Sequence, residues 1–215
     1  MFSKIFPKIH AEGYKFLVIA GIITIIFYIF SDFLGLVGFI FTIWVYYFFR
    51  DPERVIINDD NFLVSPADGE VIKVEEVDGP KELNLENKRF KKISIFMNVF
   101  DCHVNRSPCG GKIEEILYKP GKFFNASLDK ASEDNERNYF KIKDNQNNDI
   151  VLVQIAGLVA RRIVCEANKD QELNQGDRVG MIRFGSRADV YYENYEPLVK
   201  VGQIAVSGET LLAKK

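Results

Sequence analysis

A long apolar segment near the start of the chain constrains its fold more than any other feature. From residue 16 to residue 49 the only ionisable side chain other than tyrosine is Asp32, which separates the apolar runs Phe16–Phe30 and Phe33–Phe49. As helices these runs would be roughly 23 Å and 26 Å long, whereas one continuous helix would be about 51 Å, too long for a bilayer core of ~30 Å. We therefore predict two short transmembrane helices in a membrane anchor over residues 1–49.

Basic residues on either side of this segment predict its orientation. Lysines precede the first run and arginines follow the second, while no basic residue lies at the turn. The positive-inside rule then places both ends in the cytoplasm. We expect an anchor in the cell inner membrane with the following domain on the cytoplasmic side; a re-entrant or interfacial anchor is the alternative.

Residues 50–215 have the composition of a water-soluble domain. Residues 1–49 hold three of the 28 basic and two of the 30 acidic side chains, so the remainder has a formal net charge of −3, which disfavours nucleic-acid binding through bulk charge. Cys102, Cys109 and Cys165 are too few and too irregularly spaced for a disulfide framework or a zinc site. We expect reduced thiols and no metal site.

Short β-rich runs separated by turn residues dominate from residue 61 onward, and no long helical period follows residue 50. This pattern predicts a mainly β (β-rich α+β) fold, a compact barrel or sandwich. The polar residues 125–137 are expected to form a loop that carries function. The expected strands are 62–65, 69–77, 92–97, 112–118, 139–142, 150–155, 162–165 and 177–184.

His103 is the best candidate for a general acid or base in this domain. The other histidine, His10, precedes the apolar segment, and histidine is the side chain whose ordinary pKa lies closest to neutrality. The neighbouring Asp101 and Cys102 favour an accessible turn, and a half-buried strand histidine is the alternative.

Two turn-like sites supply further candidates. Ser186 follows Gly185 after a strand-like run, so we expect it where the chain turns, behind a residue that adopts strained backbone angles freely. Asp68 lies in a Ser-Pro-Ala-Asp-Gly segment typical of a turn. An ordinary turn is the alternative for both. Brought together by the fold, Ser186, His103 and Asp68 could act as nucleophile, base and orienting group.

Five motifs follow the apolar segment in one order. They are Phe49-Arg-Asp-Pro-Glu-Arg54, Ser65-Pro-Ala-Asp-Gly69, Asp101-Cys-His-Val-Asn-Arg106, Leu128-Asp-Lys-Ala-Ser-Glu-Asp-Asn-Glu-Arg137 and Phe184-Gly-Ser-Arg187. Together with the two predicted membrane helices, these motifs resemble the short bacterial form of phosphatidylserine decarboxylase over essentially the whole chain. The resemblance implies pyruvoyl-dependent conversion of phosphatidylserine to phosphatidylethanolamine in phospholipid biosynthesis.

The same resemblance implies a proenzyme that cuts itself between Gly185 and Ser186. Attack of Ser186 Oγ on the preceding carbonyl, elimination and hydrolysis would leave Ser186 as a pyruvoyl group, whose ketone reacts with the substrate amine. It implies that His103 handles the proton of turnover and that Asp68 belongs to the self-cleavage set. The two cleaved chains are expected to stay associated, with a dimer of these heterodimers as a further expectation.

One position departs from the longer family members, which carry a second histidine three positions after the first. This chain has Arg106 there, so either His103 serves both steps or strain and Asp68 suffice for cleavage. Arg106 and Arg187 are candidates for binding the substrate phosphate or carboxylate, because the planar guanidinium fork suits such anions. A structural ion pair is the alternative.

Two other functions remain open from the sequence. A membrane-anchored serine hydrolase would use Ser186, His103 and Asp68 without self-cleavage. A membrane-anchored biotinyl- or lipoyl-like barrel carrier is indicated by similar Gly-Glu segments at 64–72 and 201–212 and by Lys130 in Asp-Lys-Ala. That lysine lies in a polar loop without flanking strands, unlike the lysine of known carriers.

Overall fold

The computed structural model describes residues 6–127, 134–158, 162–183 and 185–215. Contacts divide the chain into two compact units, Met1–Glu53 and Arg54–Lys215. The first unit contains four elements. These are strand β1 (Lys8–Ile9), helix α2 (Gly13–Phe30), helix α3 (Asp32–Phe48) and strand β2 (Arg50–Asp51), which pairs with β1.

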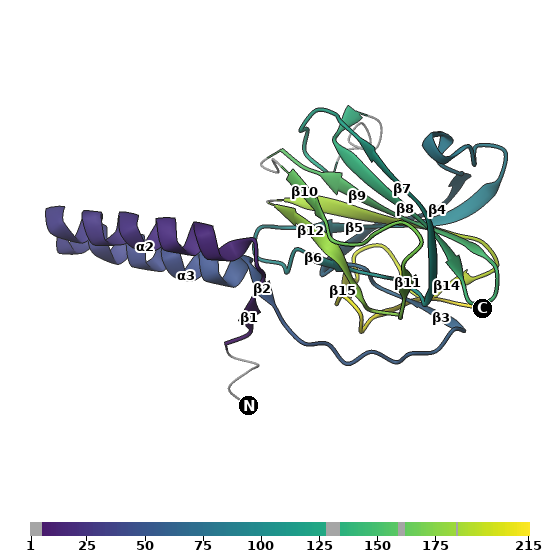
Figure 1. Ribbon diagram of the computed structural model, residues 1–215, viewed down its shortest axis with the longest axis horizontal. Helices are drawn as coiled ribbons and strands as arrows, with labels where there is room; N and C mark the ends of the chain where they lie inside the picture. The colour runs from purple at the N-terminus through teal and green to yellow at the C-terminus, as the bar shows by residue number, and fades with distance from the viewer. Residues whose placement is uncertain (1–5, 128–133, 159–161, 184) are drawn as a thin grey trace. The chain divides into compact units, whose positions relative to one another are not determined.

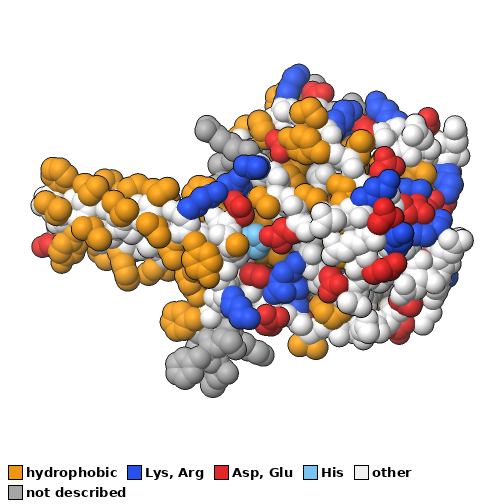
Figure 2. All heavy atoms as spheres, viewed as in Figure 1, with side chains coloured by type: hydrophobic (Ala, Val, Ile, Leu, Met, Phe, Trp, Pro, Cys, Tyr) orange, Lys and Arg blue, Asp and Glu red, His pale blue; other side chains and the backbone are white. Residues whose placement is uncertain are grey.

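The two helices form an apolar pair that breaks at Ser31, whose backbone is extended. The Oγ1 atoms of Thr24 and Thr42 lie 2.9 Å apart and hydrogen-bond across the pair. Apolar side chains cover its surface (Figure 2), and α2 is long and apolar enough to cross a membrane, whereas α3 is slightly shorter. The predicted helix pair is confirmed, and its apolar surface is consistent with membrane association.

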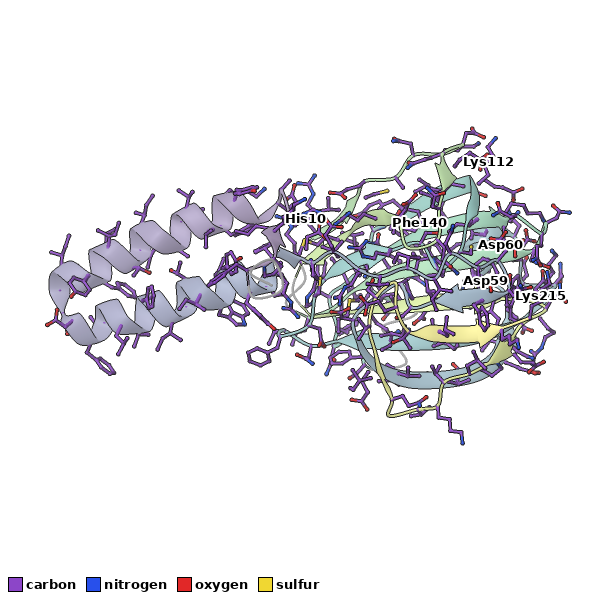
Figure 3. The ribbon with its side chains drawn as sticks, turned by 90° about the horizontal axis from the view of Figure 1, so that it is seen from below. His10, Asp59, Asp60, Lys112, Phe140 and Lys215 are labelled. Atoms are coloured by element: carbon purple, nitrogen blue, oxygen red, sulfur yellow. The ribbon has the colours of Figure 1, made fainter. Side chains whose placement is uncertain are left out.

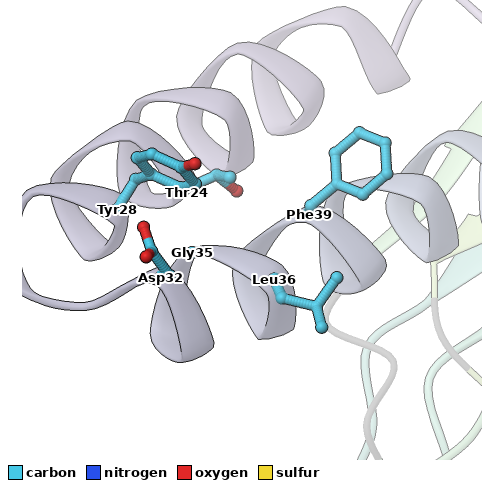
Figure 4. A pocket seen from close by; sticks show the side chains of 6 residues that line it. All are labelled: Thr24, Tyr28, Asp32, Gly35, Leu36 and Phe39. Atoms are coloured by element: carbon cyan, nitrogen blue, oxygen red, sulfur yellow. The ribbon is translucent and has the colours of Figure 1, made fainter.

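A small hollow lies between the two helices near their turn (Figure 4). Its lining includes Thr24, Tyr28 and Asp32, with Gly35, Leu36 and Phe39 completing it. All six of these lining residues belong to α2 and α3.

Strands make up nearly all regular structure of the second unit. They are β3 (Phe62–Val64), β4 (Gly69–Asp78), β5 (Arg89–Met97), β6 (Val104–Arg106), β7 (Gly111–Lys119), β8 (Arg137–Asp144), β9 (Asp149–Ala156), β10 (Arg162–Cys165), β11 (Glu172–Leu173), β12 (Arg178–Arg183), β13 (Ser186–Tyr192), β14 (Glu196–Pro197), β15 (Ile204–Ala205) and β16 (Leu211–Lys214), with a 3₁₀ turn at Lys81–Leu83.

The strands form one large curled sheet and two small sheets (Figure 1). The large sheet has the order β11-β7-β8-β9-β13-β5-β4-β15, and all its pairings are antiparallel. The small sheets have the orders β10-β12-β6 and β14-β16-β3. The predicted mainly β domain behind an apolar helix pair is confirmed.

Hydrophobic clusters lie on both faces of the large sheet. On β9, Ile150 and Leu152 belong to the main cluster, whereas Val151 and Val153 belong to a smaller one on the opposite face. Phe140 of β8 is fully buried in the main cluster (Figure 3). Burial on both faces explains why β9 is almost continuously apolar.

Strand β13 corrects the expectation that Ser186 lies in a turn. Ser186 begins a seven-residue strand that pairs with β5 on one side and β9 on the other. The apolar pattern of this strand is interrupted by Arg187 and Asp189, which are both buried and form an ion pair at 2.8 Å. Because each charge compensates the other, a central strand of the sheet can bury both residues.

Candidate active site

The predicted cleavage junction lies where a left-handed residue meets this central strand. Gly185 has φ +55°, a conformation that disfavours any residue with a Cβ. Ser186 follows it, is fully buried, and pairs with Met97 on β5 and Ala156 on β9. The strand ladder therefore holds Ser186 from both sides, and the bond before it lies at a break in backbone conformation.

The carbonyl group of Gly185 is closely packed against a second glycine. An ideal Cβ on Gly157 would lie 2.0 Å from the Gly185 oxygen, far inside van der Waals contact. Gly157 directly follows β9, the neighbour of β13 in the sheet. The backbone after β9 thus confines the carbonyl that Ser186 would attack.

Ser186 Oγ lies on the face of the sheet that carries the main core. Among the residues that the structure describes, its side-chain hydrogen-bond contact is Met97 Sδ at 3.7 Å. A thioether sulfur is a weak acceptor. The hydroxyl is therefore not committed to a strong acceptor.

His103 is fully buried, which corrects the expected accessible turn. Its Nδ1 lies 3.0 Å from the carbonyl oxygen of Asp101. Since a carbonyl oxygen only accepts, Nδ1 carries a hydrogen, which leaves Nε2 as the ring nitrogen that can exchange a proton with a substrate. The His103 carbonyl accepts a hydrogen bond from Ile182 of β12, which ends two residues before Gly185. The backbone of His103 is thus bonded to the strand that precedes Gly185 and Ser186 in the chain.

Asp68 has partners other than the two remaining members of the predicted set. Arg54 donates from Nη2 to both carboxylate oxygens, at 2.9 and 2.7 Å, and the Ser207 amide donates to Oδ1 at 2.8 Å. Within the described parts of the domain, no hydrogen bond joins Asp68 to His103 or Ser186. The three residues do not form a hydrogen-bonded relay, which disfavours the serine hydrolase alternative.

The two candidate arginines are buried and bonded within the protein. Arg106 donates to a backbone carbonyl at 3.0 Å. Arg187 pairs with Asp189 through Nε and Nη2, at 2.8 and 3.0 Å, and donates from Nη1 to the Ala126 carbonyl at 3.1 Å. Because alternate residues of a strand face opposite sides, Arg187 points away from the face that carries Ser186. These contacts give both arginines structural roles, and substrate binding by either stays a prediction.

A chain of buried amides beside Ser186 was not anticipated from the sequence. Asn138 donates to Gln154 at 3.3 Å, Gln154 donates to Asn105 at 2.9 Å, and Asn105 contacts Met97 Sδ at 3.6 Å. The same sulfur contacts Ser186 Oγ. The sequence signal that could have revealed this chain of amides was Gln154, which interrupts the apolar run of strand β9. These amides form a polar end of the core next to Ser186.

Metal and thiol chemistry have little support in this domain. Within the described ranges, no three histidine, cysteine or acidic side chains are grouped to hold a metal ion. The cysteines are not joined in disulfides, and burial raises the pKa of the Cys109 thiol well above its ordinary value, so its reactive thiolate is disfavoured. Lys130, on which the carrier alternative depends, lies outside the described residues.

Known proteins resemble the chain over the whole domain that carries these residues. A family model described as phosphatidylserine decarboxylase matches residues 41–213. A phosphatidylserine decarboxylase proenzyme of Pelagibacter ubique is 74% identical over 215 residues, which is 100% of both chains. Proenzymes of the same name are 53% identical in Ruegeria pomeroyi, over 95% of this chain and 94% of the relative, and 50% identical in Cereibacter sphaeroides, over 99% and 92%.

Proposed function

Because the chain belongs to the phosphatidylserine decarboxylase family, we propose that it decarboxylates phosphatidylserine with a pyruvoyl group made from its own Ser186. The reaction is that of the family, and the proposal concerns how this chain performs it. The group would arise by self-cleavage between Gly185 and Ser186. Neither rival function accounts for the full-length similarity to proenzymes of this name.

The geometry of the Gly185–Ser186 junction is the observation that best supports Ser186 as the source of the pyruvoyl group. A left-handed glycine precedes a serine whose hydroxyl has only a weak sulfur partner, and the carbonyl between them is confined by Gly157. A nucleophile and an electrophile in adjacent residues react only when strain or packing holds them in a reactive arrangement. The confinement of the Gly185 carbonyl by Gly157 and the weakly bonded Ser186 hydroxyl support self-cleavage at this junction.

Self-cleavage needs only groups of this chain and water. Ser186 Oγ attacks the Gly185 carbonyl carbon, the C–N bond breaks, and the acyl group moves from nitrogen to oxygen to give an ester. Loss of the Ser186 Cα proton then expels the Gly185 carboxylate and leaves dehydroalanine. Hydrolysis of that residue releases ammonia and leaves a ketone at the new N-terminus.

The surroundings of Ser186 fit a small keto group. The position is fully buried, in the strand ladder between β5 and β9. When formed, the group supplies a carbonyl that binds the substrate amine and accepts the electrons released with carbon dioxide. Because Nδ1 is held by the Asp101 carbonyl, Nε2 would be the His103 atom that first accepts a proton and then delivers it to the substrate carbon.

The two cleaved chains would stay together because of the place of β13 in the sheet. Residues 186–215 supply β13, which lies between β5 and β9, as well as β14, β15 and β16. Separation would expose both neighbouring strands and the core residues Ala188 and Val190. We propose a tightly associated heterodimer of residues 1–185 and 186–215, and a dimer of such heterodimers stays a prediction.

Anchoring would suit a substrate that stays in the bilayer. We propose that the apolar helices within residues 1–49 hold the catalytic domain, residues 50–215, at the cytoplasmic face of the inner membrane. A phospholipid headgroup lies in the plane of the bilayer surface, so tethering raises the local concentration of substrate at the enzyme.

Intact mass measurement of the purified full chain tests the proposed function. We expect two polypeptides, residues 1–185 and the 30-residue chain 186–215, the latter blocked by a pyruvoyl group. A single intact chain in an active preparation, or a free serine at residue 186, would contradict it. One polypeptide with an adduct from a serine-reactive probe would support the hydrolase, and a biotinyl or lipoyl mass on Lys130 the carrier.

Asp68→Ala is expected to accumulate uncut chain. The change leaves Arg54 and the Ser207 amide without their carboxylate, and charge-assisted hydrogen bonds are worth ~1.5–3 kcal/mol, enough to slow a dependent step about tenfold or more. The cut fraction is measured by mass at fixed times after expression.

Arg54→Gln is the matched control for Asp68→Ala, because it breaks the same ion pair and keeps the carboxylate. Normal cutting of Arg54→Gln would show that cleavage depends on the Asp68 carboxylate itself. Equal loss in both variants would show that cleavage requires the ion pair. Normal cutting of Asp68→Ala would remove Asp68 from the self-cleavage set.

A further inference from the structure

We propose that Gly157 is the residue that positions the Gly185 carbonyl for self-cleavage, and that Ala126, fixed by Asn135 and Arg187, holds Gly157 in place. This inference rests on the proposed function, since it concerns how the cut between Gly185 and Ser186 is prepared. It assigns a role in processing to Gly157 and Ala126, which lie outside the sequence motif of the cleavage site.

The contact between Gly157 and Gly185 leaves no room for a side chain. A Cβ at residue 157 would lie 2.0 Å from the Gly185 oxygen and 2.9 Å from its carbonyl carbon. Glycine is the residue that permits such a close backbone approach. Any larger residue at 157 must therefore displace the carbonyl that Ser186 attacks.

Gly157 is itself fixed relative to Ser186. The preceding residue, Ala156, is the cross-strand partner of Ser186. The Ala156 carbonyl accepts a hydrogen bond from Asn135 Nδ2 at 2.7 Å, and its amide donates to the Glu136 carbonyl at 2.9 Å. The pairing of β9 with β13 therefore fixes Gly157, which confines the Gly185 carbonyl, relative to the nucleophile Ser186.

Ala126 also lies close to Gly157. Its Cβ would be 3.3 Å from a Cβ at residue 157. Asn135 bonds to both the amide and the carbonyl of Phe124, at 2.9 and 2.8 Å, and Arg187 Nη1 donates to the Ala126 carbonyl at 3.1 Å. Asn135 and Arg187 are both fully buried. These bonds fix the segment 124–126 against Gly157.

Such fixation matters because attack within a chain depends steeply on geometry. Reacting atoms must approach to about 3–3.5 Å with aligned orbitals, and a displacement of ~1 Å can cost about 10²-fold in rate. A methyl group at residue 157 would have to move the Gly185 oxygen by a comparable amount to remove the 2.0 Å contact. The rate of cleavage should therefore fall steeply when residue 157 carries a side chain.

The test compares Gly157→Ala with Gly111→Ala in the full chain. Gly111 is the matched control because its added Cβ would also meet a strand carbonyl, that of Lys143, at 2.2 Å, but away from Ser186. We expect the 186–215 fragment to appear about 10²-fold more slowly in Gly157→Ala. Gly111→Ala should be cut at the wild-type rate with a lower thermal midpoint.

Hydroxylamine gives a readout that a loss of stability alone would not change. It cuts the ester formed by the acyl shift, leaving a Gly185 hydroxamate and a free Ser186 amine. We expect it to accelerate cutting of the wild-type precursor and to leave folded Gly157→Ala uncut, because the ester does not form there. Cutting of Gly157→Ala at the wild-type rate, spontaneously or with hydroxylamine, would overturn the inference.

Arg187→Lys decides the question should Gly157→Ala not fold. Lysine keeps the positive charge beside Asp189 but loses the fork that also reaches the Ala126 carbonyl. Slower cutting of this variant in the absence of substrate supports the inference, and wild-type cutting overturns it. A wild-type chain that is never cut at 185–186 would instead overturn the proposed function, so the two failures are distinguishable.

Discussion

Ser186→Ala is expected to yield a full-length, folded protein with no decarboxylase activity above the uncatalysed rate. Alanine has no oxygen to receive the Gly185 acyl group, so neither the cut nor the pyruvoyl group can form. Without that group, the loss should be about 10⁶-fold or more, the usual scale of enzymatic rate enhancement. Intact mass and carbon dioxide release from phosphatidylserine vesicles measure the two effects.

The fold should tolerate this change. Ser186 Oγ contributes only a weak contact to Met97 Sδ, and alanine suits a fully buried strand position. Ser94→Ala is the matched control, since Ser94 is an equally buried serine on the neighbouring strand β5, paired with Asp189. That variant should be cut and active. A Ser186→Ala chain that still splits would place the cut elsewhere or assign it to another protease.

His103→Ala is expected to yield substantially cut protein that carries the pyruvoyl group and turns over slowly. A positioned acid typically contributes ~10²–10⁴-fold, and His103 presents one proton-exchanging nitrogen, Nε2, in a buried site. In the proposed maturation, cleavage happens once per molecule and would be assisted by the Gly185 conformation and the Gly157 contact, so a slower reaction would suffice. Intact mass and kcat measured on the same preparation separate the two steps.

His10→Ala controls for the loss of a histidine as such, because His10 lies in the other unit of the chain. It should be cut and active. An uncut His103→Ala chain would show that His103 also serves as the processing base, at the place where longer relatives have a second histidine and this chain has Arg106. A cut and fully active His103→Ala chain would remove it from the mechanism.

The sequence predicts the elements of this fold where its composition changes abruptly. The helix break at Ser31 agrees closely with the predicted runs because Ser31 and Asp32 interrupt a continuous apolar segment, and strand β10 has the predicted bounds. Strand β13 was missed because Arg187 and Asp189 interrupt its pattern, and only their mutual ion pair makes them compatible with a core. An ion pair between side chains two residues apart produces no apolar periodicity from which a buried strand could be predicted.

The candidate site was predictable by residue type and not by contact. Gly185, Ser186 and His103 stand out by chemistry, whereas the Asp68 partners Arg54 and Ser207 come from distant parts of the chain. Contacts between residues far apart in the sequence depend on the arrangement of the whole sheet, so no local sequence pattern predicts them. The close approach of Gly157 to Gly185 is of the same kind, since a glycine's neighbours are visible only in three dimensions.

The central position of β13 also orders events during biosynthesis. A growing chain folds from its N-terminus, so β5 and β9 leave the ribosome before the strand that must insert between them, and β16, which returns to β3, emerges last. Ser186 reaches its final surroundings only when translation is nearly complete. In the proposed maturation, a prematurely terminated polypeptide would stay an inert precursor, so the appearance of activity would report that synthesis and folding had both finished.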